Sequence, residues 1–277
     1  MGKEWKPDVY PFTVPPEESD LSKAFSRDEL LEDLQYMMDT YIEVHPNLFF
    51  SFSREALNDK LEELRNSLSK PLNRLEFYKR IAPIAASFDD GHTMVPVPEE
   101  EYLKSDEIGD IRFPFSVDCS GKKIILKGTS LDGYKSYVGR ELLSVNGEPV
   151  EEILDEMLSM LTGERIEFKC SCIPVLFSQL LFVLRGGVEI YLLEITGDSS
   201  SETISVPGVS REHSKIASSA NRQKRTEPYS FEVLNDHDCV VLTLLSCDDE
   251  KRFKEFCAKL FSFLDQNNIG RLLIDLR

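Results

Sequence analysis

The segments Cys239-Val-Val-Leu-Thr-Leu-Leu245 and Arg271-Leu-Leu-Ile-Asp-Leu-Arg277 decide the fold of the C-terminal part of the chain. Both are apolar runs of strand length, and residues 248–268 between them repeat apolar side chains at helical spacing. A strand, a helix and a second buried strand form a βαβ unit, in which the strands are parallel and the crossover is right-handed. With a further strand at 229–234, residues 228–277 are predicted to begin an α/β domain. The helix is expected to bury Phe253, Phe256, Cys257, Leu260, Phe261 and Leu264.

Outward from this unit, residues 26–96 are predicted to be an N-terminal helical domain. Ser26 with Glu29 and Asn73 with Glu76 match the capping-box pattern, and Ser53 is a third N-cap residue. Apolar residues follow each cap at every third or fourth position, and the first helix is expected to end before Pro46. Its core-facing positions are predicted to be Leu30, Leu34, Met37, Met38, Tyr41 and Ile42. Residues 1–25, rich in proline and acid, are predicted to be an extended lead-in.

The middle of the chain, residues 111–206, is predicted to be a β-rich segment. It contains a hairpin around Cys119-Ser-Gly121, a strand at 141–145 and an Asn146-Gly147 turn. Helices are expected at 150–161 and 174–184, and paired strands at 188–195 and 203–206. The acidic residues 98–110 are predicted to be a solvated connection, and residues 207–227 a linker loop. The fold class is therefore α+β and multidomain.

Composition excludes several classes of function. The chain has 277 residues with 32 Lys+Arg and 49 Asp+Glu, a net charge of −17, which argues against nucleic acid as a partner. The longest apolar run, 173–184, is shorter than the ~20 residues of a membrane-spanning helix, so no span is predicted. Six cysteines are few for a chain of this length, so a disulfide-dense scaffold is not expected. The spacing Cys170-x-Cys172 is too short for the cysteine pair of a zinc ribbon. No metal or cofactor is predicted, and the N-terminal residues contain no apolar stretch of signal-peptide length.

His92 is the histidine whose setting best suits catalysis. It lies in Asp89-Asp90-Gly91-His92-Thr93, directly after the third predicted helix. Gly91 is expected to allow a sharp turn, and either acid could orient the imidazole. Judged from residue spacing alone, a structural role for His92 is favoured over a catalytic one. His45, before Pro46, is expected to interact with carbonyls at the helix end.

Four segments occur in an order that resembles the tail-specific serine proteases, the family of the C-terminal processing peptidases and the tricorn-protease core. The resemblance covers residues 28–277 loosely. The segments are residues 33–46, Ser87-Phe-Asp-Asp-Gly-His-Thr93, Leu143-Ser-Val-Asn-Gly147 and Leu272-Leu-Ile-Asp-Leu-Arg277.

This resemblance implies a helical N-terminal region, a PDZ-like segment and the beginning of an α/β catalytic core. His92 matches the general base of tricorn-type members, with Asp89 and Asp90 as candidate orienting acids, whereas other members use a Ser-Lys pair. The family's serine and its Gly-rich oxyanion turn follow the Asp-Leu-Arg strand. The chain is therefore expected to be the N-terminal part of an endopeptidase that cleaves unstructured polypeptides or C-terminal tails, and to be inactive alone. The resemblance implies a location in the cell envelope or outside the cell. A cytoplasmic location is the alternative.

Residues 139–161 resemble the strand, Asn-Gly turn and helix of a PDZ domain, which binds a peptide by β-augmentation. The candidate peptide-binding residues are Gly139, Leu142, Leu143, Val145, Asn146 and Gly147. A small packing module is the alternative for this segment. For the whole chain, the alternative is a non-catalytic peptide-binding or scaffolding protein with the same fold. The strand at 271–277 is expected to be poorly covered on one face, which would favour self-association.

Overall fold

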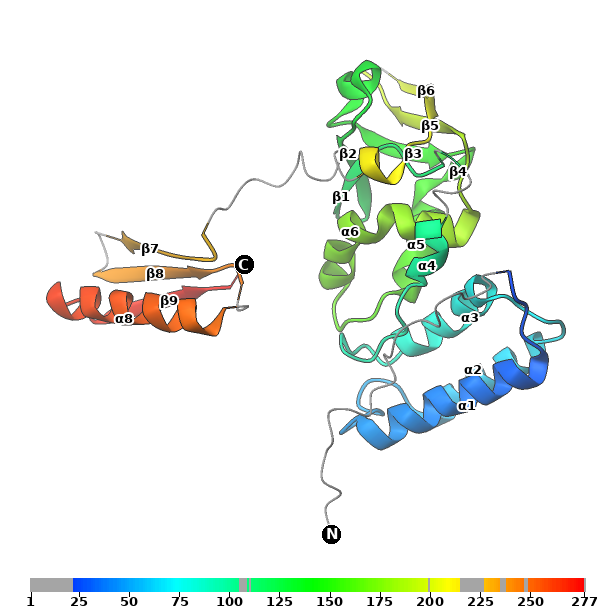
Figure 1. Cartoon of the computed structure of the whole chain (residues 1–277), viewed down its shortest axis with the longest axis horizontal. Coiled ribbons are helices and arrows are strands. Elements are labelled where there is room, and N and C mark those ends of the chain that lie inside the picture. Colours follow the sequence, from blue (N-terminus) through cyan, green and yellow to red (C-terminus); the bar gives the residue numbers. More distant parts are fainter. Residues whose placement is uncertain are drawn as a thin grey trace, which may run out of the picture. The chain divides into compact units, whose positions relative to one another are not determined.

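The computed structural model describes residues 22–104, 109, 111–198, 200–214, 227–234, 238–246 and 249–276. The fold mixes α and β structure (Figure 1) and divides into two compact units, Met1–Asn221 and Arg222–Arg277. The unit boundary falls within the predicted linker 207–227, of which residues 215–226 lie outside the described residues. Residues 1–21 of the predicted lead-in lie outside them as well.

The N-terminal unit begins with the three predicted helices, α1 (Arg27–Val44), α2 (Arg54–Ser67) and α3 (Arg74–Ala86). Ser26 and Asn73 form complete capping boxes, and the Ser53 hydroxyl accepts the Ala56 N–H. The helices bury a shared apolar core of Leu30, Leu34, Met38, Leu57, Leu61, Leu64, Leu68, Phe77, Ile84 and Phe88. Ile42 was expected in this core but is exposed, because it lies at the edge of the α1 stripe.

The acidic connection was expected to be solvated, and part of it is ordered. Glu99–Lys104 forms a short helix, α4, in which Glu101 is buried. Burial of a carboxylate requires a partner, and the Arg74 Nε lies 3.2 Å from Glu101 Oε1. This ion pair ties that part of the acidic stretch to the first turn of α3.

An antiparallel sheet follows, built from β1 (Ser116–Ser120), β2 (Lys123–Gly128), β3 (Glu141–Val145), β4 (Glu148–Pro149), β5 (Ile190–Thr196) and β6 (Ser201–Pro207). The strand order is β1-β2-β3-β5-β6, with β4 paired to β3, and the short 3₁₀ helix η3 (Asp132–Tyr137) connects β2 to β3. Asn146 and Gly147 both have positive φ, as a two-residue hairpin turn requires. The predicted hairpins and turn are confirmed.

Two helices pack on this sheet, α5 (Val150–Met160) and α6 (Ile166–Arg185). The helix predicted at 174–184 begins eight residues earlier, because the residues before Pro174 also have a core-facing side. That side includes Cys170 and Ile173, which join the largest apolar core. By length and composition α6 is apolar enough to cross a membrane, with an 18-residue window of mean hydropathy 1.6. A buried core helix passes the same test.

The C-terminal unit contains β7 (Tyr229–Leu234), β8 (Cys239–Leu244), α8 (Glu250–Gln266) and β9 (Arg271–Asp275). β7 is antiparallel to β8, and β8 is parallel to β9, which confirms the predicted βαβ unit. Leu260 and Leu264 of α8 pack against Val240 and Leu242. Phe261, predicted to be buried, is exposed because it lies on the far side of α8.

The edge strand β9 leaves apolar side chains uncovered on both faces, whereas only one face was expected to be poorly covered. Leu273 and Ile274 are both about half exposed. They lie on opposite faces of the strand, since successive side chains alternate. Self-association through this strand stays a prediction.

Candidate functional site

The turn that carries His92 follows α3 and is organised by the Asp90 carboxylate. Asp90 Oδ1 accepts the His92 backbone N–H at 3.2 Å, and Oδ2 accepts the Thr93 hydroxyl at 2.5 Å. The Thr93 hydrogen bond, helped by the His92 amide and by His45, lowers the pKa of Asp90 against the opposing effect of burial. Asp90 therefore caps the turn as a charged group at neutral pH.

The left-handed backbone position of this turn is Asp89, with φ of 50°, and not Gly91 as expected. Aspartate tolerates this conformation better than most residues because its short polar side chain can hydrogen-bond locally. The Asp89 carboxylate lies 3.6 Å from Lys169 Nζ of α6. The structure therefore directs Asp89 toward α6, whereas Asp90 lies beside His92.

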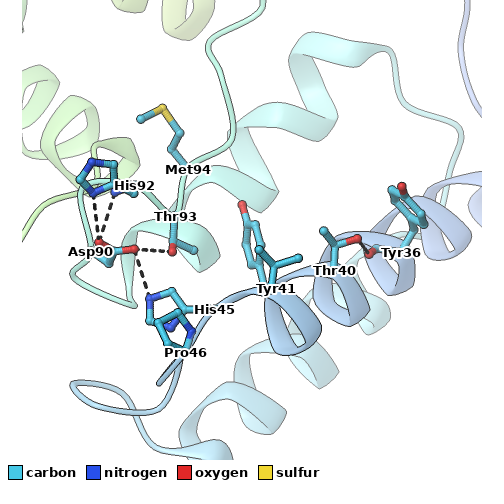
Figure 2. A pocket seen from close by; sticks show the side chains of 10 residues that line it. Tyr36, Thr40, Tyr41, His45, Pro46, Asp90, His92, Thr93 and Met94 are labelled. Carbon is cyan, nitrogen blue, oxygen red and sulfur yellow. Dashed lines mark hydrogen bonds and ion pairs between the residues drawn. The ribbon is translucent and has the colours of Figure 1, made fainter. Parts of the chain in front are cut away.

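His45, at the end of α1, links the first helix to the turn (Figure 2). Its Nε2 lies 3.2 Å from Asp90 Oδ2, and its Nδ1 accepts the Asn47 backbone N–H at 3.0 Å. Because Nδ1 is an acceptor, the proton of the neutral ring belongs on Nε2, which donates to Asp90. His45 was expected to interact with helix-end carbonyls, and it instead holds a residue of the candidate site.

The His92 side chain is fully exposed. Its Nδ1 lies 3.7 Å from Asp90 Oδ1, which is close enough for an ion pair and too long for a hydrogen bond. The structure thus brings together His92 and one of the two acids predicted to orient it. The imidazole is free to meet another group from the solvent side.

A second contact fixes the turn from α6. An added Cβ at Gly163, where φ is 133°, would lie 2.4 Å from Phe168 Cδ1, so the Phe168 ring packs directly on this glycine. The same ring lies next to Gly91, where an added Cβ would be 3.8 Å from its Cε1. Together with Lys169, Phe168 anchors the turn to α6, as His45 anchors it to the end of α1.

A pocket of about 620 Å³ opens beside the turn, between it and α1 (Figure 2). Its walls come from the C-terminal half of α1 and from the residues that follow Asp90. The lining residues are Tyr36, Thr40, Tyr41, Val44, His45, Pro46, Asp90, His92, Thr93 and Met94. No serine or cysteine is among these residues.

The candidate peptide-binding residues lie in and beside β3, in the interior of the sheet. β3 pairs with β5 on one side and with β2 and β4 on the other. The side chains of Leu142 and Val145 are buried, Leu143 is half-buried, and Asn146 and Gly147 form the exposed turn. Gly139 donates its N–H to the Leu126 carbonyl. A peptide strand that added to β3 would have to displace a neighbouring strand, and binding there stays a prediction.

Alternative chemistries find little support in the described part of the chain. Within it, no three His, Cys, Asp or Glu side chains gather closely enough to hold a metal ion. Burial, with a contribution from the Cys170 thiol, raises the pKa of Cys119 to about 12. A thiol with so high a pKa is protonated at neutral pH and is a poor nucleophile.

No family model matches the chain, and no curated protein matches it by sequence. The crystal structure of mature CPAF, a chlamydial serine protease, matches with 15% identity and a TM-score of 0.51, over 90% of this chain and 55% of that chain. A CPAF mutant with serine replaced by alanine matches with 14% identity and a TM-score of 0.49, over 90% of this chain and 56% of that chain.

The match to mature CPAF defines a class of fold. The chain has a protease-like fold, related at a distance to that of a tail-specific protease-like serine protease. The chain spans about half the length of the CPAF structures that it matches. At 15% identity the likeness shows the fold, and it assigns no activity to any residue.

Proposed function

We propose that this chain is the N-terminal part of a serine-type endopeptidase of the tail-specific class, with His92 as its general base. The substrate is an unstructured polypeptide or a C-terminal tail. The serine nucleophile comes from a part of the protein outside these 277 residues, so the chain alone is inactive. The CPAF-like fold supports the class of enzyme, and the geometry of the turn supports the role of His92.

The observation that carries the proposal is an exposed imidazole on an anchored turn. Asp90 and His45 hold the turn to α1, while Lys169 holds it to α6. A general base must come within hydrogen-bond reach of the proton that it removes, and its supporting residues must keep it in place. An exposed histidine with only a structural role would not need anchors on both sides.

In the proposed mechanism, His92 Nε2 takes the proton of the serine hydroxyl as the oxygen attacks the peptide carbonyl. Asp90, kept ionised by its lowered pKa, stabilises the imidazolium that forms, as the acid of a serine triad does. The 3.7 Å separation of Asp90 and His92 shortens on substrate binding, since catalytic hydrogen bonds are often long in the free enzyme. His92 then returns the proton to the leaving amine.

A serine-directed fluorophosphonate probe tests this proposal. The longer protein should be labelled, this chain alone should not, and His92→Ala in the longer protein should slow labelling at least about a hundredfold. His213→Ala is the matched control, because His213 is an exposed histidine whose ring, within the described part of the chain, bonds to Ser210. Equal labelling rates for His92→Ala and the unchanged protein would exclude His92 and favour a Ser-Lys pair.

A non-catalytic peptide-binding protein is the second candidate. The order of β3, the Asn146-Gly147 turn, β4 and α5 is PDZ-like, which favours this reading. However, α6 packs against both β1 and α5, and β3 has a neighbour on each side. We therefore propose that the PDZ-like segment serves mainly as a packing module that positions α6, and through Lys169 and Phe168 the His92 turn.

A further inference from the structure

We propose that the pocket beside His92 binds a large apolar side chain of an extended polypeptide, and so selects which substrate segment reaches the imidazole. This inference rests on the proposed function, because the polypeptide is the substrate of that same site. It adds a specificity pocket built by α1, a helix outside the predicted α/β core.

The walls of the pocket are the first support. Tyr36, Val44 and Met94 line it and are each more than half exposed. Large apolar side chains that remain exposed in one concave place mark a binding surface more often than single scattered ones do. The pocket volume of about 620 Å³ lies within the ~300–1,000 Å³ range of ligand pockets. This volume is large enough for an aromatic side chain and part of its backbone.

The polar groups around Asp90 and Thr40 are the second support, because each has a hydrogen-bond or ion-pair partner within the protein. Asp90 accepts from Thr93 and lies against His45, whose other ring nitrogen accepts from Asn47. The Thr40 hydroxyl donates to the Tyr36 carbonyl. A charged ligand would have to break these pairs, whereas an apolar side chain leaves them intact.

Tyr41 supplies a polar handle for the backbone of the ligand. Figure 2 shows its hydroxyl pointing away from α1, and it has no hydrogen-bond partner among the described residues. Burial raises the pKa of Tyr41 to about 12, so the hydroxyl keeps its proton at neutral pH. It can therefore donate to a backbone carbonyl of the bound segment, which distinguishes a polypeptide from a hydrocarbon ligand.

The negative charge of α1 narrows the class of ligand further. α1 carries six acidic residues and one arginine, and its last turn contains no basic residue. Such a helix repels acidic peptides and attracts basic ones. The expected ligand is a Phe, Tyr, Leu or Met side chain flanked by neutral or basic residues.

The test uses the full 277-residue chain with ¹³C-labelled methionine methyl groups. The probe is a short acetylated and amidated peptide of Gly, Ser and Lys with one central Phe, and the same peptide with Ala in that place is its control. The Phe peptide should shift the Met94 methyl signal saturably, at least about tenfold more tightly than the Ala peptide. The signal of Met157, buried in the core, should not move.

Two arginine variants of α1 localise the binding. Val44→Arg places a long charged side chain on the pocket wall and should weaken binding at least about tenfold. Ile42→Arg is the matched control, since Ile42 is 44% exposed on the same helix and does not line the pocket, whereas Val44 is 59% exposed and does. Unchanged helical circular dichroism shows that both variants fold.

Equal shifts with the Phe and Ala peptides, or unchanged binding to Val44→Arg, would overturn the pocket assignment. Neither result involves hydrolysis, so the outcome is separate from that of the His92 experiments. If the pocket does not bind the Phe peptide but His92→Ala abolishes catalysis, only this inference is removed. Phe-dependent binding with a dispensable His92 would leave a peptide-binding pocket and remove the general base.

Discussion

His45 Nε2 lies 3.2 Å from Asp90 Oδ2, so the end of the first helix holds the carboxylate that organises the turn of His92. The same carboxylate accepts the Thr93 hydroxyl and the His92 amide. One side chain therefore connects the helical region to the candidate general base. This relationship makes His45 a positioning residue.

Removing His45 should loosen this connection. His45→Ala deletes a hydrogen bond to a charged group, which is expected to lower the free energy of unfolding by about 1–2 kcal/mol. It should also move the pKa of Asp90 up toward its ordinary value, because His45 is one of the groups that lower it. Urea unfolding and carboxyl ¹³C NMR titration measure the two effects. A variant with unchanged Asp90 titration would show that His45 does not act on the site.

Asp90 should make stability depend on pH in a defined direction. Its folded-state pKa is lowered, so its stabilisation is fully present above the unfolded-state value of about 3.9 and is lost as pH falls through the folded-state pKa. Asp90→Asn should therefore destabilise the chain at neutral pH and progressively less below about pH 4.

The matched control is Asp89→Asn. Asparagine tolerates the left-handed conformation of this position, and the 3.6 Å separation of Asp89 and Lys169 Nζ is too long for a hydrogen bond. Urea unfolding as a function of pH compares the two variants. An Asp90→Asn effect that is constant from neutral to acidic pH would mean that the charge of Asp90 contributes nothing.

Gly163 should tolerate no side chain, whereas Gly91 should. Gly163→Ala places a Cβ 2.4 Å from the Phe168 ring at a φ of 133°, and we expect a loss of about 2 kcal/mol or more of unfolding free energy. Gly91→Ala makes an ordinary contact of 3.8 Å with the same ring and should cost well under half as much. Thermal unfolding measures the loss of stability in the two variants. A larger loss for Gly91→Ala than for Gly163→Ala would contradict the packing described for Phe168.

Residues 139–161 should not recognise a free C-terminus if they act as a packing module. Peptides that differ only in a free or amidated C-terminus are expected to bind this chain equally or not at all. Isothermal titration calorimetry measures the difference. Binding that needs the free carboxylate, and that is lost in an Asn146→Ala variant, would instead establish the peptide site predicted at residues 139–147.

Much of the fold could be predicted because its signals are local. The Ser26 and Asn73 capping boxes and the Asn146-Gly147 turn each involve residues within a few positions of one another. The parallel pairing of β8 and β9 followed from the strand, helix and strand pattern, because a crossover helix lets the second strand run in the direction of the first. The start of α6 could not be predicted from local signals. Pro174 resembles the first residue of a helix, whereas tertiary packing extends the helix back to Ile166.

The candidate site was only partly predictable for a related reason. The turn residues Asp90 and His92 are neighbours in sequence, so their association was expected. The contact of Asp90 with His45 joins distant segments, and no sequence period reports it. The pocket likewise depends on how α1 lies against the turn, which the amphipathic pattern of α1 alone does not specify.

The role of His92 is the central claim, and the most direct measurement is kcat/KM of the proposed longer protein on an unfolded protein substrate. His92→Ala should lower kcat/KM at least about a hundredfold, while His213→Ala should leave it unchanged, and this chain alone should hydrolyse nothing. Comparable kcat/KM for His92→Ala and the unchanged protein would contradict the account.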